Sequence, residues 1–280
     1  MKRLLIWISL FFFFTPGHTQ SNIDFGILGG ISLYSGDLSP EDIGFSFSDL
    51  GPAAGAFVRF QFTDWVGLRT GLTYAHLGTE DARSALRNRA VSFETDIFEL
   101  SGIIEISPFN IGYYSSEAVI VPYLAIGIGA FRFNPQTEVN GQMIDLQPLG
   151  TEGQGLPGYP DRYSLNSINF PFGLGVRFVI SDQLSVGLDV IGRKLQTDYI
   201  DDVSSISVRY GDILENKGVD VARISAPSVN PDSASPDLTY QRGGPFNDFF
   251  YIASLNVSYR ISSGSQIYKP GKKGISCPRF

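Results

Sequence analysis

The C-terminal part of the chain contains the clearest alternation of apolar and polar positions. Between residues 251 and 261 every odd position is apolar, and the even positions from 254 to 260 are polar. A period of two places these two sets on opposite faces of a β-strand. The apolar face is about 25 Å long and has a tyrosine near each end, Tyr251 and Tyr259, which is typical of a lipid-facing strand. The pattern predicts a transmembrane β-strand, because a spanning helix needs about 20 mostly apolar residues.

Seven further segments show the same alternation, which brings the expected number of strands to eight. They are residues 23–34, 54–62, 65–74, 98–106, 119–133, 168–178 and 184–190. Short links alternate with long ones, as they do in outer-membrane barrels with turns in the periplasm and loops outside. We therefore expect an all-β fold: an eight-stranded antiparallel transmembrane β-barrel of the outer-membrane type. It would have long extracellular loops, a short periplasmic C-terminal tail and both termini in the periplasm. The link 212–244, rich in Pro, Ser, Asp and Gly, is expected to be mobile.

The polar faces of the expected strands carry charges of both signs, which would point into the lumen. An eight-stranded barrel is just wide enough for side chains to fill it, and an unpaired charge there would be costly. We therefore expect a filled, ion-paired lumen without an open pore. Its charged residues would be Arg69, Glu99, Glu105, Arg177, Asp189 and Arg260. Glu99 and Glu105 lie about 20 Å apart along one strand, so they cannot act as one acid–base pair.

The two ends of the chain differ in composition from the barrel segments. Residues 1–19 are expected to form a signal peptide, whose apolar core at 4–14 is too short to span a bilayer. The barrel is expected over residues 20–262, followed by a basic periplasmic tail over 263–280. The single cysteine lies in this tail and has no internal disulfide partner. The tail residues expected to bind a partner are Lys269, Lys272, Lys273, Cys277 and Arg279.

Support for catalysis is sparse, and we expect no catalytic residue and no cofactor. The mature chain has one histidine, His76, near the end of an expected strand, and Ser84 and Ser92 follow it. A hydrolase of lipid A that uses His76 at the barrel rim is therefore an alternative. A polar rim residue accounts for His76 more simply. A small pore or an adhesin that uses the long outer loops is a further alternative.

Carboxylates and net charge limit the ligands that the chain can take. Asp198, Asp201 and Asp202 are weak candidates for a Ca²⁺ site. A solvated loop start accounts for them more simply, and we expect no resident metal. The formal net charge is −7. Without a basic stripe to neutralise phosphates, nucleic acid is excluded as a partner.

Several short segments resemble one family of outer-membrane proteins. The most specific are Leu-Gln-Pro-Leu-Gly-Thr-Glu-Gly-Gln-Gly at 146–155 and Thr-Asp-Tyr-Ile-Asp-Asp-Val-Ser at 197–204. Weaker ones lie at 36–40, 93–99, 122–129, 193–194 and 277–280. Together they look like the PorG-type outer-membrane barrels of Bacteroidetes, and the resemblance covers nearly the whole mature chain. It implies a non-enzymatic barrel of the type IX secretion system that anchors a periplasmic ring of proteins to the outer membrane. The expected partners are therefore outer-membrane lipid and these ring proteins.

Overall fold

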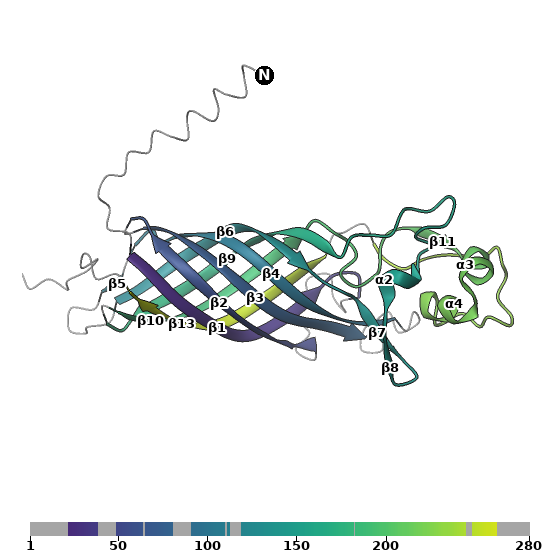
Figure 1. The fold of residues 1–280 in the computed structure, drawn as a ribbon, viewed down its shortest axis with the longest axis horizontal. Helices are drawn as coiled ribbons and strands as arrows, with labels where there is room; N and C mark the ends of the chain where they lie inside the picture. Colours follow the sequence, from purple (N-terminus) through teal and green to yellow (C-terminus); the bar gives the residue numbers. More distant parts are fainter. Residues whose placement is uncertain are drawn as a thin grey trace, which may run out of the picture.

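The computed structural model describes residues 22–38, 49–63, 65–80, 91–109, 111–112, 119–181, 183–244 and 248–261. Within these ranges, eight long strands form one ring (Figure 1). They are β1 (Asn22–Ser35), β2 (Gly51–Gln61), β3 (Val66–Glu80), β4 (Ser92–Ile106), β6 (Val119–Arg132), β9 (Asn166–Val179), β10 (Leu184–Leu195) and β13 (Phe249–Arg260). Each strand pairs antiparallel with the next, and β13 pairs with β1, so the sheet closes on itself. The predicted eight-stranded antiparallel barrel is confirmed.

Tight turns join the strands at the end of the barrel where β1 begins and β13 ends. The hydroxyl of Thr63 accepts the backbone N–H of Val66 at 3.0 Å, and the hydroxyl of Ser181 accepts that of Leu184 at 3.0 Å. In such a turn the side-chain hydroxyl accepts the hydrogen bond of a backbone N–H, as a backbone carbonyl would in a regular turn. The two short links therefore hold β2 against β3 and β9 against β10 at this end, which we call the turn end. The short strand β5 (Ile111–Gly112) also pairs with β6 here.

Three strands extend further from the turn end than the sequence pattern predicts. β3 continues to Glu80, β4 already begins at Ser92 and β10 continues to Leu195. In these extensions the alternation is inverted at most positions: the inward side is mainly apolar, and the outward side is polar or glycine. On β4, for example, Phe93 and Ile97 are buried inside, whereas Asp96 between them is exposed. The alternation itself persists, so the strands continue beyond the apolar wall.

The inverted part of the barrel encloses an apolar core. Its buried residues come from β1, β2, β3, β4, β6, β10 and β13 and from the connections above them. The largest are Tyr34, Leu38, Leu77, Phe93, Phe131, Phe133, Leu195, Ile200 and Phe250. Tyr34 and Phe93 meet edge to face with ring centroids 4.9 Å apart. The strands thus have a polar interior and an apolar wall near the turn end, and an apolar interior with a polar wall at the opposite end.

Beyond this core the long connections fold into a cap (Figure 1, right). It contains the hairpin β7 (Gln136–Val139) and β8 (Gln142–Asp145), α2 (Leu146–Leu149), the paired strands β11 (Ser207–Arg209) and β12 (Thr239–Gln241), α3 (Tyr210–Lys217) and α4 (Val219–Ser225). The residues described here include no helix with the length and apolar character needed to cross a membrane.

The expectation of a mobile link at 212–244 did not anticipate this order. Val208, Tyr210, Ile213 and Ala222 are fully buried in a second small core within the cap. Two short helices and a strand pack around these side chains. The apolar residues are too few and too widely spaced to indicate helices by periodicity, so composition alone suggested an irregular loop.

Candidate functional site: a sealed lumen beneath a folded cap

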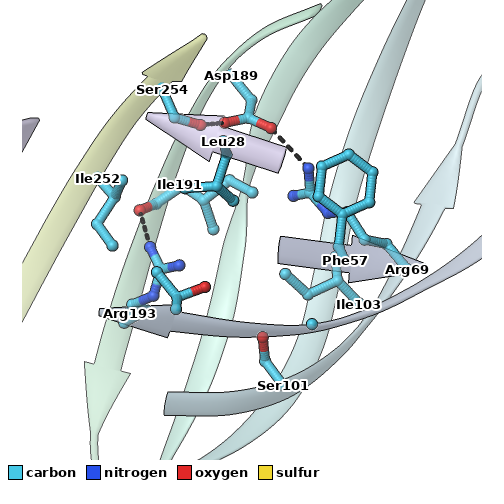
Figure 2. A pocket seen from close by; sticks show the side chains of 12 residues that line it. Leu28, Phe57, Arg69, Ser101, Ile103, Asp189, Ile191, Arg193, Ile252 and Ser254 are labelled. Carbon is cyan, nitrogen blue, oxygen red and sulfur yellow. Dashed lines mark hydrogen bonds and ion pairs between the residues drawn. The ribbon is translucent and has the colours of Figure 1, made fainter. Parts of the chain in front are cut away.

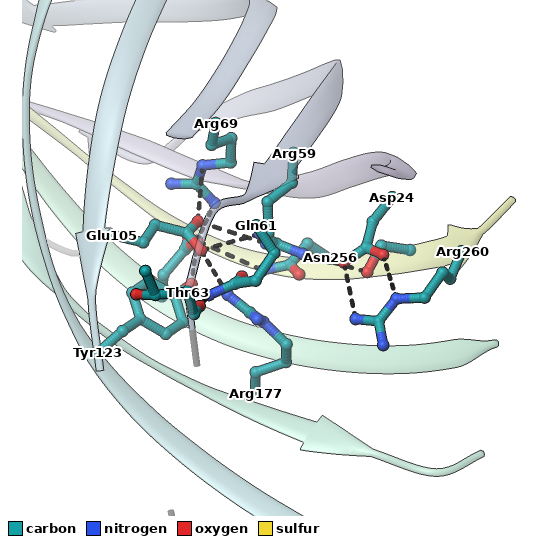
Figure 3. A network of polar contacts seen from close by, with 12 residues as sticks. Asp24, Arg59, Gln61, Thr63, Arg69, Glu105, Tyr123, Arg177, Asn256 and Arg260 are labelled. Atoms are coloured by element: carbon teal, nitrogen blue, oxygen red, sulfur yellow. Dashed lines mark hydrogen bonds and ion pairs between the residues drawn. The ribbon is translucent and has the colours of Figure 1, made fainter. Parts of the chain in front are cut away.

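One carboxylate near the turn end is surrounded by three arginines (Figure 3). Arg59 Nε donates to Glu105 Oε2 at 2.8 Å, and Arg69 Nε lies 3.3 Å from Glu105 Oε1. Arg177 also donates to Glu105. Glu105 and Arg59 are almost completely buried. The three guanidinium groups would repel one another, and the negative charge of Glu105 between them holds them together.

Asp189 forms the second charged centre of the lumen. Its Oδ2 accepts hydrogen bonds from Arg69 Nη1 at 2.7 Å and from the Tyr123 hydroxyl at 2.9 Å. Ser254 and Asn256 donate to the same carboxylate from β13. Arg69 therefore links Asp189 to Glu105, and seven strands of the ring, β2, β3, β4, β6, β9, β10 and β13, meet in one continuous network.

Two smaller ion pairs lie on either side of this network. Toward the turn end, Arg260 Nε donates to Asp24 Oδ1 at 2.8 Å, and Arg59 lies 3.7 Å from the same carboxylate. Toward the cap, Arg193 Nε donates to Glu99 Oε2 at 2.8 Å, just below the apolar core. The charges that the sequence places six residues apart on β4 thus serve separate pairs.

The structure therefore brings Arg69, Glu105, Arg177 and Asp189 into one network and gives Glu99 and Arg260 partners outside that expected set. These two partners are Arg193 and Asp24, and like Arg59, which pairs with Glu105, they were absent from the expected lumen charges. Arg59 and Asp24 could have been found, because both belong to the polar alternation of their strands. Arg193 lies where the alternation of β10 is interrupted by the buried Ile191 and Gly192, so no pattern marked it.

Aromatic rings fill much of the space that the ion pairs leave. The ring of Phe57 lies under two guanidinium groups, with centroid distances of 5.0 Å to Arg59 and 5.5 Å to Arg69. A Cβ placed on Gly26 would lie 2.2 Å from this ring. Glycine at position 26 is therefore required for Phe57 to occupy the lumen.

The lumen contains a cavity of about 20 Å³ that lies between Asp189 with Arg69 on one side and Arg193 on the other (Figure 2). Phe57, Arg69, Asp189, Arg193 and Ser254 are among the residues that line it. A water molecule needs about 10–15 Å³ measured in this way, so the cavity has room for roughly one. The interior between Glu105 and the apolar core is thus filled by side chains.

The two sequence segments with the most specific resemblance meet in the cap. Glu152 accepts hydrogen bonds from the backbone N–H of Ser204 at 2.8 Å and from its hydroxyl at 2.6 Å. Thr151 donates to Asp202, whose carboxylate lies 3.1 Å from Arg242 Nη1. All five side chains are buried, and we call them the cap knot. The two motifs form one structural unit, and these contacts account for the buried polar residues in both.

Below the cap knot, buried carboxyl groups surround Tyr34. Its hydroxyl lies 2.6 Å from Asp201 Oδ2 and 3.1 Å from Asp248 Oδ1. Burial raises the pKa of both Asp201 and Asp248 well above the usual range. A single hydroxyl hydrogen cannot serve both carboxylates, so a proton held on one of them completes the hydrogen bonding. Burial also raises the pKa of Asp198 to about 7, with the nearby charge of Asp37 adding to the shift.

The three weak metal candidates do not converge on one point. Asp202 pairs with Arg242, Asp201 receives the Tyr34 hydroxyl, and Asp198 lies beside Asp37. In the described part of the chain, no group of three or more His, Cys, Asp or Glu side chains is placed to hold a metal ion. Neighbours along the sequence point in different directions because Asp202 has a left-handed backbone conformation, with φ of 61°.

His76 lies on the outer surface of β3, near the end of the apolar wall. Its Nδ1 is 2.9 Å from Asp96 Oδ1, which also accepts the hydroxyl of Tyr74 at 2.8 Å. Ser92 lies four residues beyond Asp96 on β4, about 13 Å along the strand, and its hydroxyl is 3.1 Å from that of Thr137. The structure therefore does not bring Ser92 to His76. Ser84, the expected signal peptide over residues 1–19 and the tail residues Lys269, Lys272, Lys273, Cys277 and Arg279 lie outside the described residues.

The fold and the filled lumen define the class of this protein: an eight-stranded barrel of the outer-membrane type. The chain belongs to the family described as "Domain of unknown function (DUF6089)", whose model matches residues 2–216. A comparison with curated proteins finds no match.

Among solved structures, the chain is similar to several small outer-membrane barrels. For Neisserial surface protein A (NspA) the identity is 11%, the TM-score is 0.40, and 87% of this chain and 98% of that chain are covered. For Ail of Yersinia pestis, solved with the heparin analogue sucrose octasulfate, the identity is 9% and the TM-score is 0.38, and 86% of this chain and 97% of that chain are covered. For OprG of Pseudomonas aeruginosa the identity is 11% and the TM-score is 0.38, and 87% of this chain and 98% of that chain are covered. Similarity at this level says nothing about what the present chain binds.

Proposed function

We propose that this protein is a non-conducting, non-enzymatic anchor in the bacterial outer membrane. The observation that carries this proposal is the filled lumen, in which Glu105 and Asp189 tie arginines from several strands together. Ions would have to displace these buried pairs and then the apolar core in order to pass. The barrel thus supplies rigidity and a fixed position in the membrane, with binding left to its two ends.

The cap end would face the outside, and the turn end with both termini would face the periplasm. Long connections outside and tight turns in the periplasm are the usual arrangement for such barrels. The apolar band of the wall supports insertion, because strands β1, β4, β9 and β13 expose large apolar side chains such as Ile27, Leu100, Leu174 and Leu255. A surface of this size would otherwise lead to aggregation.

The partner follows from the resemblance to PorG-type barrels. In this proposal the periplasmic turns and the basic tail, with Lys269, Lys272, Lys273, Cys277 and Arg279, bind ring proteins of the type IX secretion system. The contrast between the basic tail and the acidic chain supports a dedicated contact with an acidic partner surface. The described residues contribute a fixed turn end from which such a tail can extend.

A pull-down from detergent-solubilised outer membranes tests the partner. The tagged wild-type protein should recover ring components, identified by mass spectrometry. A chain that lacks residues 267–280 should fold, as judged by its gel mobility before and after heating, yet lose them. A second variant with Lys269, Lys272 and Lys273 changed to Gln separates charge from length. Recovery of the barrel alone from wild-type cells would refute the secretion role, and unchanged recovery by the truncated chain would refute the role of the tail.

A lipid-A hydrolase is the less supported alternative, because Ser92 does not reach His76. It predicts that His76→Ala alters the lipid A mass spectrum, whereas the anchor predicts an unchanged spectrum. An ohmic conductance in planar bilayers would instead support a pore and refute the sealed lumen.

A further inference from the structure

The outer wall of the barrel has a hollow at the level where its interior changes from polar to apolar. The hollow measures about 600 Å³ and extends over β2, β3, β4, β6 and β9. Small residues form its floor, since Ala54 and Ala130 occupy outward positions where neighbouring strands carry large side chains. Leu72 and Leu100, which are 64% and 55% exposed, form its apolar side toward the turn end. A lipid-facing wall cannot leave such a space empty, so an acyl chain is its natural occupant.

One row of directly paired residues forms the edge of the hollow toward the cap. Across the five strands this row consists of Ala54, Tyr74, Phe98, Arg132 and Asn166. Farther toward the cap, the outward positions on β3 and β4 are polar, with His76 opposite Asp96. The row therefore coincides with the boundary between the apolar wall and the polar wall. Lipid headgroups lie at this level of a membrane protein.

Arg132 is the only cation of this row, and it is exposed. Within the described part of the chain its guanidinium makes no ion pair, in contrast to the paired arginines of the lumen. An arginine at a lipid-facing position is stable near the interface and unfavourable deeper in the bilayer. Its planar group suits a phosphate, to which it can donate two parallel hydrogen bonds. An unpaired arginine directly above an apolar hollow complements a lipid whose phosphate and acyl chain are adjacent.

The aromatic side of the hollow is held in place before any ligand binds. The hydroxyl of Tyr74 donates to Asp96 at 2.8 Å, and the ring of Tyr74 packs against Phe98 with centroids 5.3 Å apart. His76 contacts the same carboxylate at 2.9 Å. Asp96 is thus engaged on β4 by two side chains and leaves Arg132 to the ligand. A site that is ordered in advance loses less entropy on binding.

We propose that this hollow binds one molecule of lipid A, with a phosphate on Arg132 and an acyl chain between Leu72, Leu100 and Ala130. The inference rests on the proposed orientation, which places the cap end and hence this row in the outer leaflet. It assigns a specific lipid contact to one side of the barrel and goes beyond the anchoring role.

Binding is tested with the purified barrel by native mass spectrometry. The protein is exchanged into lipid-free detergent and titrated with diphosphoryl lipid A or with lipid A from which both phosphates have been removed. Arg132→Gln should bind the diphosphoryl form about tenfold more weakly, since hydrogen bonds to charged groups are the stronger ones. Ala130→Phe should lose both forms, because the ring occupies the hollow. Folding of each variant is checked by its gel mobility before and after heating.

Two control variants lie on another side of the barrel. Lys194→Gln removes an exposed cation from β10, and Val190→Phe adds a ring to the lipid-facing wall of the same strand. Both should bind diphosphoryl lipid A as the wild type does. Equal binding by wild type and Arg132→Gln, or equal binding of the two lipid forms by the wild type, would overturn the proposal. Because no secretion partner is present in this assay, its outcome is independent of the ring pull-down.

Discussion

Replacement of Glu105 by Gln tests whether ion pairs hold the lumen together. The substitution keeps the shape of the side chain but removes the charge that faces Arg59, Arg69 and Arg177. Loss of one partner from a buried ion pair usually costs about 3–5 kcal/mol, because the remaining charge stays buried. Only Arg69 keeps a strong second partner, through Asp189 at 2.7 Å. We therefore expect Glu105→Gln to lower the free energy of unfolding by about 4 kcal/mol, a large part of the 5–15 kcal/mol typical of folded proteins.

The measurement is a urea titration of the barrel refolded into phospholipid vesicles. Trp65 is the only tryptophan after residue 19, and it lies at the turn between β2 and β3, where it reports on membrane insertion by fluorescence. Asp237→Asn is the matched control. It removes a carboxylate that pairs with Arg209 at 2.9 Å while 86% exposed, and such pairs contribute less than about 1 kcal/mol.

A second substitution makes the test specific for the network. Arg177→Gln, combined with Glu105→Gln, removes one of the arginines that lose their counter-charge. The double variant should be less destabilised than the sum of the two single variants, by about 1–3 kcal/mol. If Glu105→Gln costs no more than the surface control, or if the two effects simply add, the reasoning about the lumen is refuted.

Four further outcomes follow from the filled lumen, the close strand pairing and the cap knot. The wild-type barrel should produce no current steps in planar bilayers, because the cavity in its lumen measures only about 20 Å³. Steady ohmic steps would contradict a filled lumen. Arg242→Gln should make the cap sensitive to protease while the barrel strands stay resistant, because it removes the cation that holds Asp202; protection equal to wild type would contradict the cap knot. Burial raises the pKa of Glu152 and of Asp198 to about 7, so the folded cap favours their protonated forms. Cap stability should therefore be greatest below about pH 4 and fall as the pH rises through 7, which limited proteolysis with an acid-tolerant and a neutral protease can measure; no change across this range would refute it. Gly30→Val should reduce refolding yield, because a Cβ there would lie 2.1 Å from a backbone oxygen of β13.

The barrel could be predicted from the sequence because lipid and lumen impose opposite polarity on alternate residues. All eight segments with this alternation correspond to strands of the ring. The ends of β3, β4 and β10 were missed, since the expected strands stopped where the outward positions ceased to be apolar. At Ala75 and Leu77 the inward side becomes apolar, and without apolar outward residues this part of β3 resembles the start of a loop.

Pairing in the lumen was harder to predict than the presence of charge. Alternation shows that Glu105 and Arg177 point inward, but only the register across several strands shows that they meet. β4 and β9 do not pair with one another and lie on either side of β6. Glu105 and Arg177 therefore meet inside the lumen, and not as neighbours on paired strands. Arg59 and Asp24 are different, because the alternation of β2 and β1 already points both side chains inward and the expected set could have included them. The cap was less predictable still, because its contacts join segments separated by tens of residues, as Thr151 and Arg242 illustrate.

The inversion of polarity along the strands connects the fold to the proposed function. Near the turn end the strands present apolar side chains to lipid on the outside and paired charges on the inside, so neither face needs further covering. Toward the cap the same strands have water outside and require an apolar core inside, which Phe93, Phe133 and Phe250 supply. Such a core must be closed from above, and the connections between strands close it by packing Leu38, Leu146 and Ile200 onto it. The cap is therefore a structural consequence of extending the strands beyond the apolar wall, and closing the core in this way is what the proposed non-conducting role requires.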